Sequence, residues 1–445
     1  MRYCFDIETN GFLDECTTVH CIVLKNIDTN EILKPTNEEA IKLLSEADLI
    51  AGHNIIKFDI PVLEKLFGFK TKAQIFDTIV ATRLLFPDIR DSDFKRNDFP
   101  ANCIGRHSLK AWGYRVGNYK EAFDTDWQTF SSDMLDYCVQ DVEVTHSLFT
   151  MIENRGYSEQ AMKLEHDVAS LIFRQEQHGF TFDKEKAQQL YSKLNARRAE
   201  LEEEFQKLFK PITTKRISPK TGKQLKDKIT VFNPSSRLHI ADRLKTKYNW
   251  QPDVYTSDGK PKLDDTILSK LDYPEAKLLA EHFLLDKRIG QLATGAQAWL
   301  KNETNGKIHG TCNTNSTVTA RASHSHPNLG QVPSVSVPYG KDCRSLFTVP
   351  KNKKLVGIDI SGLEVRMLAH FMSKYDDGEY SKVVLEGDIH TETQKLAGLE
   401  SRDLAKRFYY AFLYGSGVKK IALITNKKVS EASKIKKRFL NNLPA

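Results

Sequence analysis

Short apolar runs alternate with longer amphipathic segments through the first 156 residues, and this alternation limits the possible fold more than any other feature. Apolar runs rich in β-branched and aromatic residues predict strands at 1–8, 21–25 and 49–52. Segments with helical periodicity predict helices at 61–69, 74–86 and 132–153. Strands followed by helices are typical of an α/β domain, which we expect to end near Gly156.

Helical periodicity dominates the rest of the chain. Apolar positions recur at spacings of three, four and seven through 161–209, which predicts a long amphipathic, hairpin-like helical element. Further helices are expected at 235–247, 273–303, 362–375, 391–398, 402–414 and 430–441. The apolar run KLVGIDI predicts a strand at 354–360. A chain of 445 residues exceeds the usual size of one hydrophobic core, so we expect two or more domains.

Charge is unevenly distributed along the chain. Residues 1–158 hold 17 Lys and Arg against 25 Asp and Glu, whereas 159–445 hold 48 against 33. Seven cations and one aspartate lie in 210–228, which we interpret as a mobile basic loop beside a nucleic-acid backbone. The alternatives are a solvated linker and a chance asymmetry of solvated faces.

The sequence also predicts a location. It contains no run of 18 apolar residues, and Asp6 and Glu8 stand where a signal peptide needs an apolar stretch. We therefore expect a cytoplasmic protein that makes no membrane contact. The seven cysteines are scattered and never spaced CxxC, which predicts neither a zinc site nor a disulfide framework.

Four carboxylates and a tyrosine form the first group of candidate catalytic residues. Asp6 and Glu8 lie two residues apart on a predicted strand, so they share one face. Asp59 follows another strand, and Tyr137 and Asp141 are one helical turn apart. Acids gathered in space need divalent cations to offset their repulsion, as in two-metal phosphodiester hydrolysis. A surface pair is the alternative for the DxE pattern alone.

The order DIE, NxxxFD and YxxxD over about 140 residues resembles the proofreading 3′–5′ exonuclease domain of the DEDDy type. The resemblance implies that Asp6, Glu8, Asp59 and Asp141 are metal ligands and that Tyr137 orients the nucleophile. Asp77 and Asp136 match no part of the motif. We expect capping or surface roles for both.

A second group lies near the C-terminus. Asp359 ends the predicted strand, where an acid can hold Mg²⁺ against a triphosphate. Cations and aromatic residues then recur every four positions along one helix face, at Arg402, Lys406, Tyr410 and Tyr414. Such a stripe suits phosphates and a base or sugar. A half-buried packing face is the alternative.

These patterns, DxSxxExR and RxxxKxxxYxxxYG, resemble the first two polymerase motifs of family A (Pol I-type) DNA polymerases. The segments GTCNTN, TAR, PNLGQ and GDIH, which lie between 310 and 390, extend the resemblance. Within the family, the resemblance is to the replicative polymerases of short-tailed T-odd phages, and it covers essentially the whole chain.

The resemblance implies roles for single residues. Asp359 would bind the catalytic metal, shared by the backbone carbonyl of Ile360. The incoming triphosphate would be held by His390, Arg402 and Lys406. Glu364 would exclude ribonucleotides by crowding the sugar 2′ position.

Further roles concern the sugar and the duplex. Tyr410 would stack near the sugar, and a tyrosine there implies ready acceptance of dideoxynucleotides. Duplex contacts near the primer end, through minor-groove acceptors, are implied for Arg321, Asn328 and Gln331. Tyr414 is also assigned to DNA binding.

The implied fold is an α/β exonuclease domain with a ribonuclease H-like mixed sheet, followed by a helical thumb and an incomplete α+β palm and fingers. The expected boundaries are 1–157 for the exonuclease, 158–305 for the thumb with its basic loop 210–232, 306–385 for the partial palm and 386–445 for the partial fingers. The implied cofactor is Mg²⁺, for which Mn²⁺ can substitute. The implied partners are DNA primer–template, single-stranded 3′ ends and dNTPs, in a phage-infected bacterial cell.

Two departures from the family pattern affect these expectations. The long insertion that binds host thioredoxin in the phage enzymes is reduced to the basic stretch 210–232, so we expect no thioredoxin dependence. The third polymerase motif, a His-Asp-Glu-type segment, is absent from the sequence. A split gene whose second polypeptide completes the polymerase, an incomplete gene, a stand-alone exonuclease and a non-enzymatic DNA-binding subunit all remain open. The sequence also predicts that the open edge of strand 354–360 makes the C-terminal half marginally stable.

Overall fold

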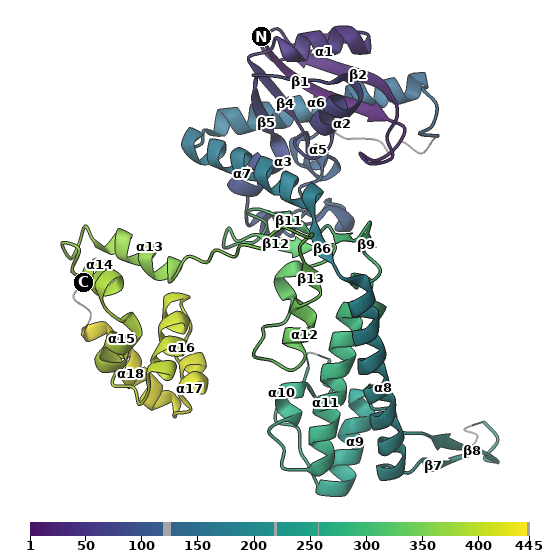
Figure 1. The fold of residues 1–445 in the computed structure, drawn as a ribbon, viewed down its shortest axis with the longest axis vertical. Helices are drawn as coiled ribbons and strands as arrows, with labels where there is room; N and C mark the ends of the chain where they lie inside the picture. The colour runs from purple at the N-terminus through teal and green to yellow at the C-terminus, as the bar shows by residue number, and fades with distance from the viewer. Residues whose placement is uncertain (119–125, 218–219, 257, 443–445) are drawn as a thin grey trace. The chain divides into compact units, whose positions relative to one another are not determined.

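The protein consists of two compact units, Met1–Lys354 and Leu355–Ala445. The computed structural model describes residues 1–118, 126–217, 220–256 and 258–442 (Figure 1). Each unit has its own apolar core. The finer division into four parts remains a prediction.

The first unit begins with a five-stranded mixed sheet in the order β3-β2-β1-β4-β5. Its strands are β1 (Arg2–Thr9), β2 (Val19–Asn26), β3 (Ile32–Leu33), β4 (Leu49–Gly52) and β5 (Gln74–Asp77). The central strand β1 pairs antiparallel with β2 and parallel with β4. The predicted helix 74–86 is wrong in its first four residues, because β5 extends the sheet before the helix begins.

Helices cover both faces of this sheet (Figure 1). On one face, α1 (Asn37–Ser45) and α2 (Asp59–Phe67) share a core with Phe5 and Ile7 of β1. On the other, α6 (Ser132–Arg155) shares a core with Cys4. The alternation of β1 thus divides its side chains between two cores. Three shorter helices complete this part: α3 (Thr78–Leu85), α4 (Ile89–Asp93) and α5 (Leu109–Val116).

A helical region with a separate core follows in the first unit. Its main elements are α7 (Glu159–His178), β6 (Phe180–Phe182), α8 (Lys184–Leu208), α9 (Arg237–Tyr248), α10 (Asp265–Leu268) and α11 (Pro274–Ile289). The predicted element 161–209 is therefore two helices separated by a short strand. Gly179 makes the break at φ +62°, and a Cβ there would meet the His309 ring at 2.7 Å. The predicted helix 273–303 ends early, because a π-helical turn at Gly290–Thr294 closes it.

Short strands and a helix follow α11. They are β9 (Glu303–Thr304), β10 (Lys307–Ile308), β11 (Thr311–Asn313), β12 (Ser323–Ser325), α12 (Gly340–Arg344) and β13 (Phe347–Thr348). A four-stranded sheet in the order β13-β6-β10-β9 joins the start of the helical region to its end.

The segment predicted as a mobile basic loop is a β-hairpin. Its strands β7 (Ile212–Ile217) and β8 (Gln224–Thr230) pair antiparallel, and almost every side chain on them is exposed. Ile and Thr residues in both strands provide the strand propensity that the charge pattern concealed. Ser218 and Pro219 of the predicted loop lie outside the described residues.

The second unit is helical throughout its ordered elements. These are α13 (Leu363–Met372), α14 (Glu379–Glu386), α15 (Ile389–Ala397), α16 (Arg402–Leu413), α17 (Val418–Thr425) and α18 (Val429–Asn441). Phe408, Tyr409 and Phe439 are at most 1% exposed at its centre. The helices predicted at 362–375, 391–398, 402–414 and 430–441 are confirmed as α13, α15, α16 and α18.

The strand predicted at 354–360 is wrong. Residues 353–360 run without regular structure, and none of the described residues pairs with them as a strand. Val356 and Ile358 are 77% and 89% exposed. A segment with strand propensity does not form a strand by itself, because its backbone N–H and C=O groups need a neighbouring strand for hydrogen bonding.

One half-buried histidine makes the first unit sensitive to acid. Burial, followed by the charges of Arg83 and Arg115, lowers the pKa of His107 to about 4. Between pH 6.5 and 4 the unfolded state binds this proton and the folded state does not, so stability falls as the pH falls. We expect His107 to account for up to about 3 kcal/mol of that loss.

This prediction is checked by denaturant unfolding of the wild type and of His107→Gln at pH 7 and pH 4. The stability difference between the two pH values should be smaller in the variant. Equal losses in both proteins would show that His107 is not the titrating group.

No helix among the described residues is long and apolar enough to cross a bilayer.

Candidate functional site

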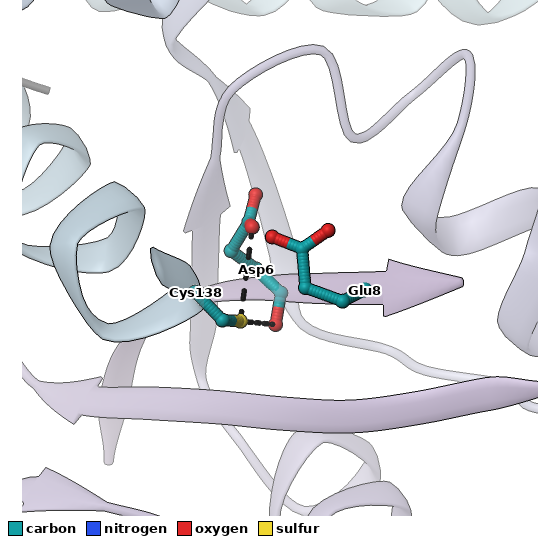
Figure 2. A group of neighbouring side chains, drawn as sticks. All are labelled: Asp6, Glu8 and Cys138. Atoms are coloured by element: carbon teal, nitrogen blue, oxygen red, sulfur yellow. Dashed lines mark hydrogen bonds between the residues drawn. The ribbon is translucent and has the colours of Figure 1, made fainter. Parts of the chain in front are cut away.

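Two carboxylates of β1 and one thiol of α6 form the centre of the first site (Figure 2). Ligand atoms of Asp6, Glu8 and Cys138 all lie within 4.8 Å of one another. The Cys138 Sγ is 3.5 Å from the backbone oxygen of Asp6 and 3.8 Å from its Oδ2. The predicted placement of Asp6 and Glu8 on one face of a strand is therefore observed.

Asp59, the first residue of α2, contacts strand β1 as well. Strand β4 ends at Gly52, and the N–H of Ile7, between the two β1 carboxylates, donates to the Asp59 side chain. Asp59 is 4% exposed. Burial, together with the charges of Asp77 and Asp141 and against hydrogen bonds from backbone N–H groups, raises the pKa of Asp59 to about 8.

Helix α6 supplies the remaining predicted residues. Asp141 is buried, and its charge acts on Asp59. Tyr137, one turn earlier, is half-buried, and its ring centroid lies 6.0 Å from that of Trp127 in an edge-on arrangement. The four predicted carboxylates thus converge from β1, α2 and α6, which are far apart in the sequence.

A fully buried aspartate holds the turn that delivers Asp59. The Asp77 carboxylate accepts from the N–H groups of Asn54 at 2.9 Å, Ile56 at 3.1 Å and Ile79 at 3.0 Å. Its own N–H donates to His166 Nε2 at 2.7 Å. The predicted capping role is confirmed, since Asp77 is the N-cap of α3. Asp136 lies on the surface, 3.7 Å from Lys34.

The first site fits divalent cations. Its oxygen donors are the hard ligands that Mg²⁺ prefers, and they gather where burial penalises their negative charge. A cation would favour the ionised form of Asp59, which the metal-free protein disfavours.

The second unit contains a groove of about 520 Å³. It brings together five of the predicted nucleotide-site residues, Asp359, His390, Arg402, Lys406 and Tyr410. Burial, followed by the charges of Arg402 and Lys406, lowers the pKa of His390. The charges of Arg402 and Lys406 therefore act on His390 within the groove, partly offset by the charge of Asp388.

Three other predicted residues of this unit lie outside the groove lining. The Tyr414 hydroxyl donates to Glu364 Oε1 at 2.7 Å, so these two residues form a pair. Ile360 is 62% exposed on the irregular segment before α13.

The predicted duplex-contacting residues lie on one stretch of the first unit. Arg321 is exposed and its N–H donates to Thr317 Oγ1, just before β12. Asn328 and Gln331 bracket a single 3₁₀ turn, where Gln331 is exposed and Asn328 is half-buried. All three residues lie between β11 and α12 in the chain.

Sequence reasoning missed two residues of these sites. Cys138 was not assigned, although it directly follows Tyr137 in the YxxxD pattern. Asp388 makes two hydrogen bonds to Arg402, at 2.6 and 3.2 Å, which hold the pKa of that carboxyl well below its usual range. The GDIH segment was the available signal, since Asp388 lies in it.

Comparisons with known proteins complete the description. A model of "DNA polymerase family A" matches residues 184–445, and a "3'-5' exonuclease" model matches 13–156. The chain is 34% identical to the DNA-directed DNA polymerases of Escherichia phage T7 and Enterobacteria phage T3, over 99% of its own length and 79% of theirs. A solved POL domain of Pol1 from M. smegmatis, in complex with DNA primer-template and dNTP, matches 98% of this chain and 72% of that chain, with a TM-score of 0.69. At 18% identity the last match shows a shared fold, and the predicted fold class is confirmed.

Proposed function

Because this chain belongs to DNA polymerase family A and carries a 3′–5′ exonuclease domain, we propose that it trims mismatched 3′ ends of DNA and takes part in phage-type DNA replication. The observation that carries the proposal is the convergence of Asp6, Glu8, Asp59 and Asp141 from three elements. This arrangement supports metal-dependent phosphodiester hydrolysis.

The exonuclease residues have separate tasks in this proposal. Asp6, Glu8, Asp59 and Asp141 hold Mg²⁺, or Mn²⁺ in its place, which when bound lowers the pKa of water and stabilises charge on the attacking and leaving oxygens. Tyr137 orients the attacking water through its hydroxyl.

The groove of the second unit would bind the incoming nucleotide. Arg402, Lys406 and His390 hold the triphosphate, while Tyr410 stacks near the sugar. Asp359 and the Ile360 carbonyl bind the catalytic metal. The M. smegmatis neighbour, which is bound to DNA primer-template and dNTP, supports a nucleotide site in this fold.

Other residues select deoxyribonucleotides over ribonucleotides and contact the DNA duplex. Glu364, held by Tyr414, crowds the 2′ position and excludes ribonucleotides. Arg321, Asn328 and Gln331 contact the primer–template duplex.

Synthesis by this fold needs a further polypeptide segment that carries the third polymerase motif, in the same chain or in a second one. The sequence printed here contains no such motif. The irregular segment 353–360 exposes apolar side chains that a sheet neighbour would cover. Helix α13 adds exposed Leu363, Met367 and Phe371 at intervals of four, which extends the surface available to that segment.

The division into exonuclease (1–157), thumb (158–305), partial palm (306–385) and partial fingers (386–445) is part of the same proposal. Independence from thioredoxin is also part of this proposal. The alignment to the T7 polymerase has 558 positions and this chain has 445 residues, so at least 113 aligned positions of the T7 polymerase have no counterpart in this chain.

A gel assay on a primer–template with a mismatched 3′ end tests the proposed function. Mg²⁺ would be present, with and without all four dNTPs. Shortening of the primer, and no extension by this polypeptide alone, is expected. Extension would show that the missing motif is not required, and no shortening would contradict the exonuclease assignment.

The β7–β8 hairpin predicts a salt-dependent contact with DNA. Lys215, Arg216 and Lys228 are all exposed on it. Each cation that neutralises a phosphate contributes about 0.9 to the slope of log K against log salt concentration. Replacing all three by Gln should therefore reduce the slope by about 2 to 3, measured by fluorescence anisotropy with duplex DNA.

The matched control replaces Lys42, Lys70 and Lys72 of the acidic N-terminal part, which are equally exposed. This variant has the same net charge as the hairpin variant. Equal slopes in the two variants would show that the hairpin makes no specific phosphate contact.

A further inference from the structure

One carboxylate of α7 connects the turn before Asp59 to the hairpin formed by β11 and β12. We propose that Glu176 is a positioning residue for the exonuclease, and that DNA duplex bound at the β11–β12 hairpin orders this turn through it. The proposal rests on the proposed function, to which both the digestion and the duplex contacts belong.

The Glu176 side chain accepts hydrogen bonds from two segments that are distant in the sequence. Both of its oxygens accept from Lys57 Nζ at 2.8 Å, and Oε1 also accepts from the N–H of Cys312 at 2.6 Å. Lys57 Nζ donates as well to the backbone oxygen of Cys312, at 3.4 Å. The turn, α7 and β11 therefore meet at one ion pair.

The two partners of Glu176 belong to the two proposed DNA-contacting regions of the first unit. Lys57 lies in the turn, two residues before Asp59. Cys312 lies in β11, and the segment that joins β11 to its partner strand β12 includes Arg321. Glu176 therefore links a proposed ligand of the exonuclease site to a proposed duplex contact.

The ion pair is shielded from solvent, which distinguishes it from a surface pair. The side chains of Lys57 and Glu176 are 23% and 13% exposed. A cavity of about 20 Å³, lined in part by Asn54, Lys57, Cys312 and Thr314, has room for about one water molecule. Water and salt therefore screen the pair little, and loss of the carboxylate removes an acceptor from a half-buried ammonium and from a backbone N–H.

The backbone of Glu176 is also fixed to the chain just before β11. Its carbonyl oxygen accepts from His309 Nδ1 at 2.8 Å. The His309 ring lies so close to Gly179 that a Cβ there would meet it at 2.7 Å. The end of α7 and the start of the β11–β12 hairpin are thus held together, so DNA that orders the hairpin also orders Glu176 and, through it, Lys57. Such a coupling is reciprocal, because an ordered turn favours the same hairpin conformation.

Hydrogen exchange of residues 53–60 in the full chain tests the coupling without digestion, in a buffer that lacks divalent cations. Duplex DNA, added at a concentration that saturates each protein by anisotropy, should raise protection of 53–60 in wild type. Glu176→Ala should bind the duplex without this gain. Glu176→Gln keeps an acceptor for Cys312 but loses the charge that holds Lys57, so its gain should be smaller than that of wild type.

The matched control is Asp167→Ala, because Asp167 is an acid of the same helix in an exposed ion pair with Lys163, at 2.7 Å. It should show the full gain in protection. No gain in wild type, or equal gains in wild type, Glu176→Ala and Glu176→Gln, overturns the proposal.

The positioning role is measured by single-turnover digestion of a mismatched primer–template in Mg²⁺. Lys57→Met should lower the maximal rate by about tenfold to a hundredfold, the usual loss when a group that orients a metal ligand is removed. The protein concentration that gives half the maximal rate should stay unchanged, since Lys57 acts on the turn. Lys57→Arg should restore most of the rate, because a guanidinium can bind both Glu176 oxygens.

The opposite pattern, an unchanged maximal rate with a higher half-maximal protein concentration in Lys57→Met, overturns the positioning role. A wild-type chain that never digests DNA would refute the proposed function. The coupling would still stand in that case if duplex DNA raises protection of 53–60 in wild type and not in Glu176→Ala.

Discussion

Replacing Asp6 and Glu8 together by alanine is expected to lower the rate of 3′-end digestion by a factor of about 10³ or more, with little change in DNA affinity. Metal ions supply several kcal/mol of charge stabilisation in such reactions. A loss of about 4 kcal/mol corresponds to a factor of about 10³ in rate. Both carboxylates point into the site from one face of β1, so their removal leaves the sheet core intact.

The measurement is single-turnover digestion of a labelled single strand in Mg²⁺, alongside anisotropy for binding. Asp136→Ala is the matched control, because Asp136 is an exposed acid on α6 that lies 3.7 Å from Lys34 at the surface. It should retain the wild-type rate. Digestion by the double variant within tenfold of wild type would contradict the assignment of these carboxylates.

The period-two pattern of β1 was enough to predict that Asp6 and Glu8 share a face. This succeeded because β1 is the central strand, whose odd and even positions enter different cores. The convergence with Asp59 and Asp141 could be expected only from the family resemblance. No local rule states where α2 and α6 pack on the sheet.

Cys138 shows why part of the site could not be predicted. In the sequence it is a small apolar residue inside an amphipathic helix, and such residues usually pack in the core. Its nearness to Asp6 depends on the distance between α6 and β1, which no sequence pattern encodes. Segment 354–360 shows the opposite error, because its strand propensity was real and the pairing strand was missing from the described residues.

Asp77→Ala is expected to open the turn that carries Asp59 and to reduce digestion even though Asp77 is not a proposed ligand. The substitution removes the acceptor from the N–H groups of Asn54, Ile56 and Ile79. A buried donor left without a partner costs about 1–3 kcal/mol. We therefore expect a local destabilisation of about 3 kcal/mol or more.

The variant Asp77→Asn tests the hydrogen bonds of the two Asp77 oxygens separately. Oδ1 accepts from Asn54 and Ile79, whereas Oδ2 accepts from Ile56. An asparagine keeps the first two bonds and turns an NH₂ group toward the third donor, so its effect should lie between those of wild type and alanine.

Hydrogen exchange of residues 53–60 is the direct readout, because it reports local opening without requiring the two units to unfold together. Protection there should fall in the order wild type, Asp77→Asn, Asp77→Ala, and the digestion rate should fall in the same order. Asp136→Ala again provides the control, since an exposed ion pair contributes only about 0–1 kcal/mol. If protection of 53–60 is unchanged in Asp77→Ala, the turn is held by its own backbone and Asp77 does not position Asp59.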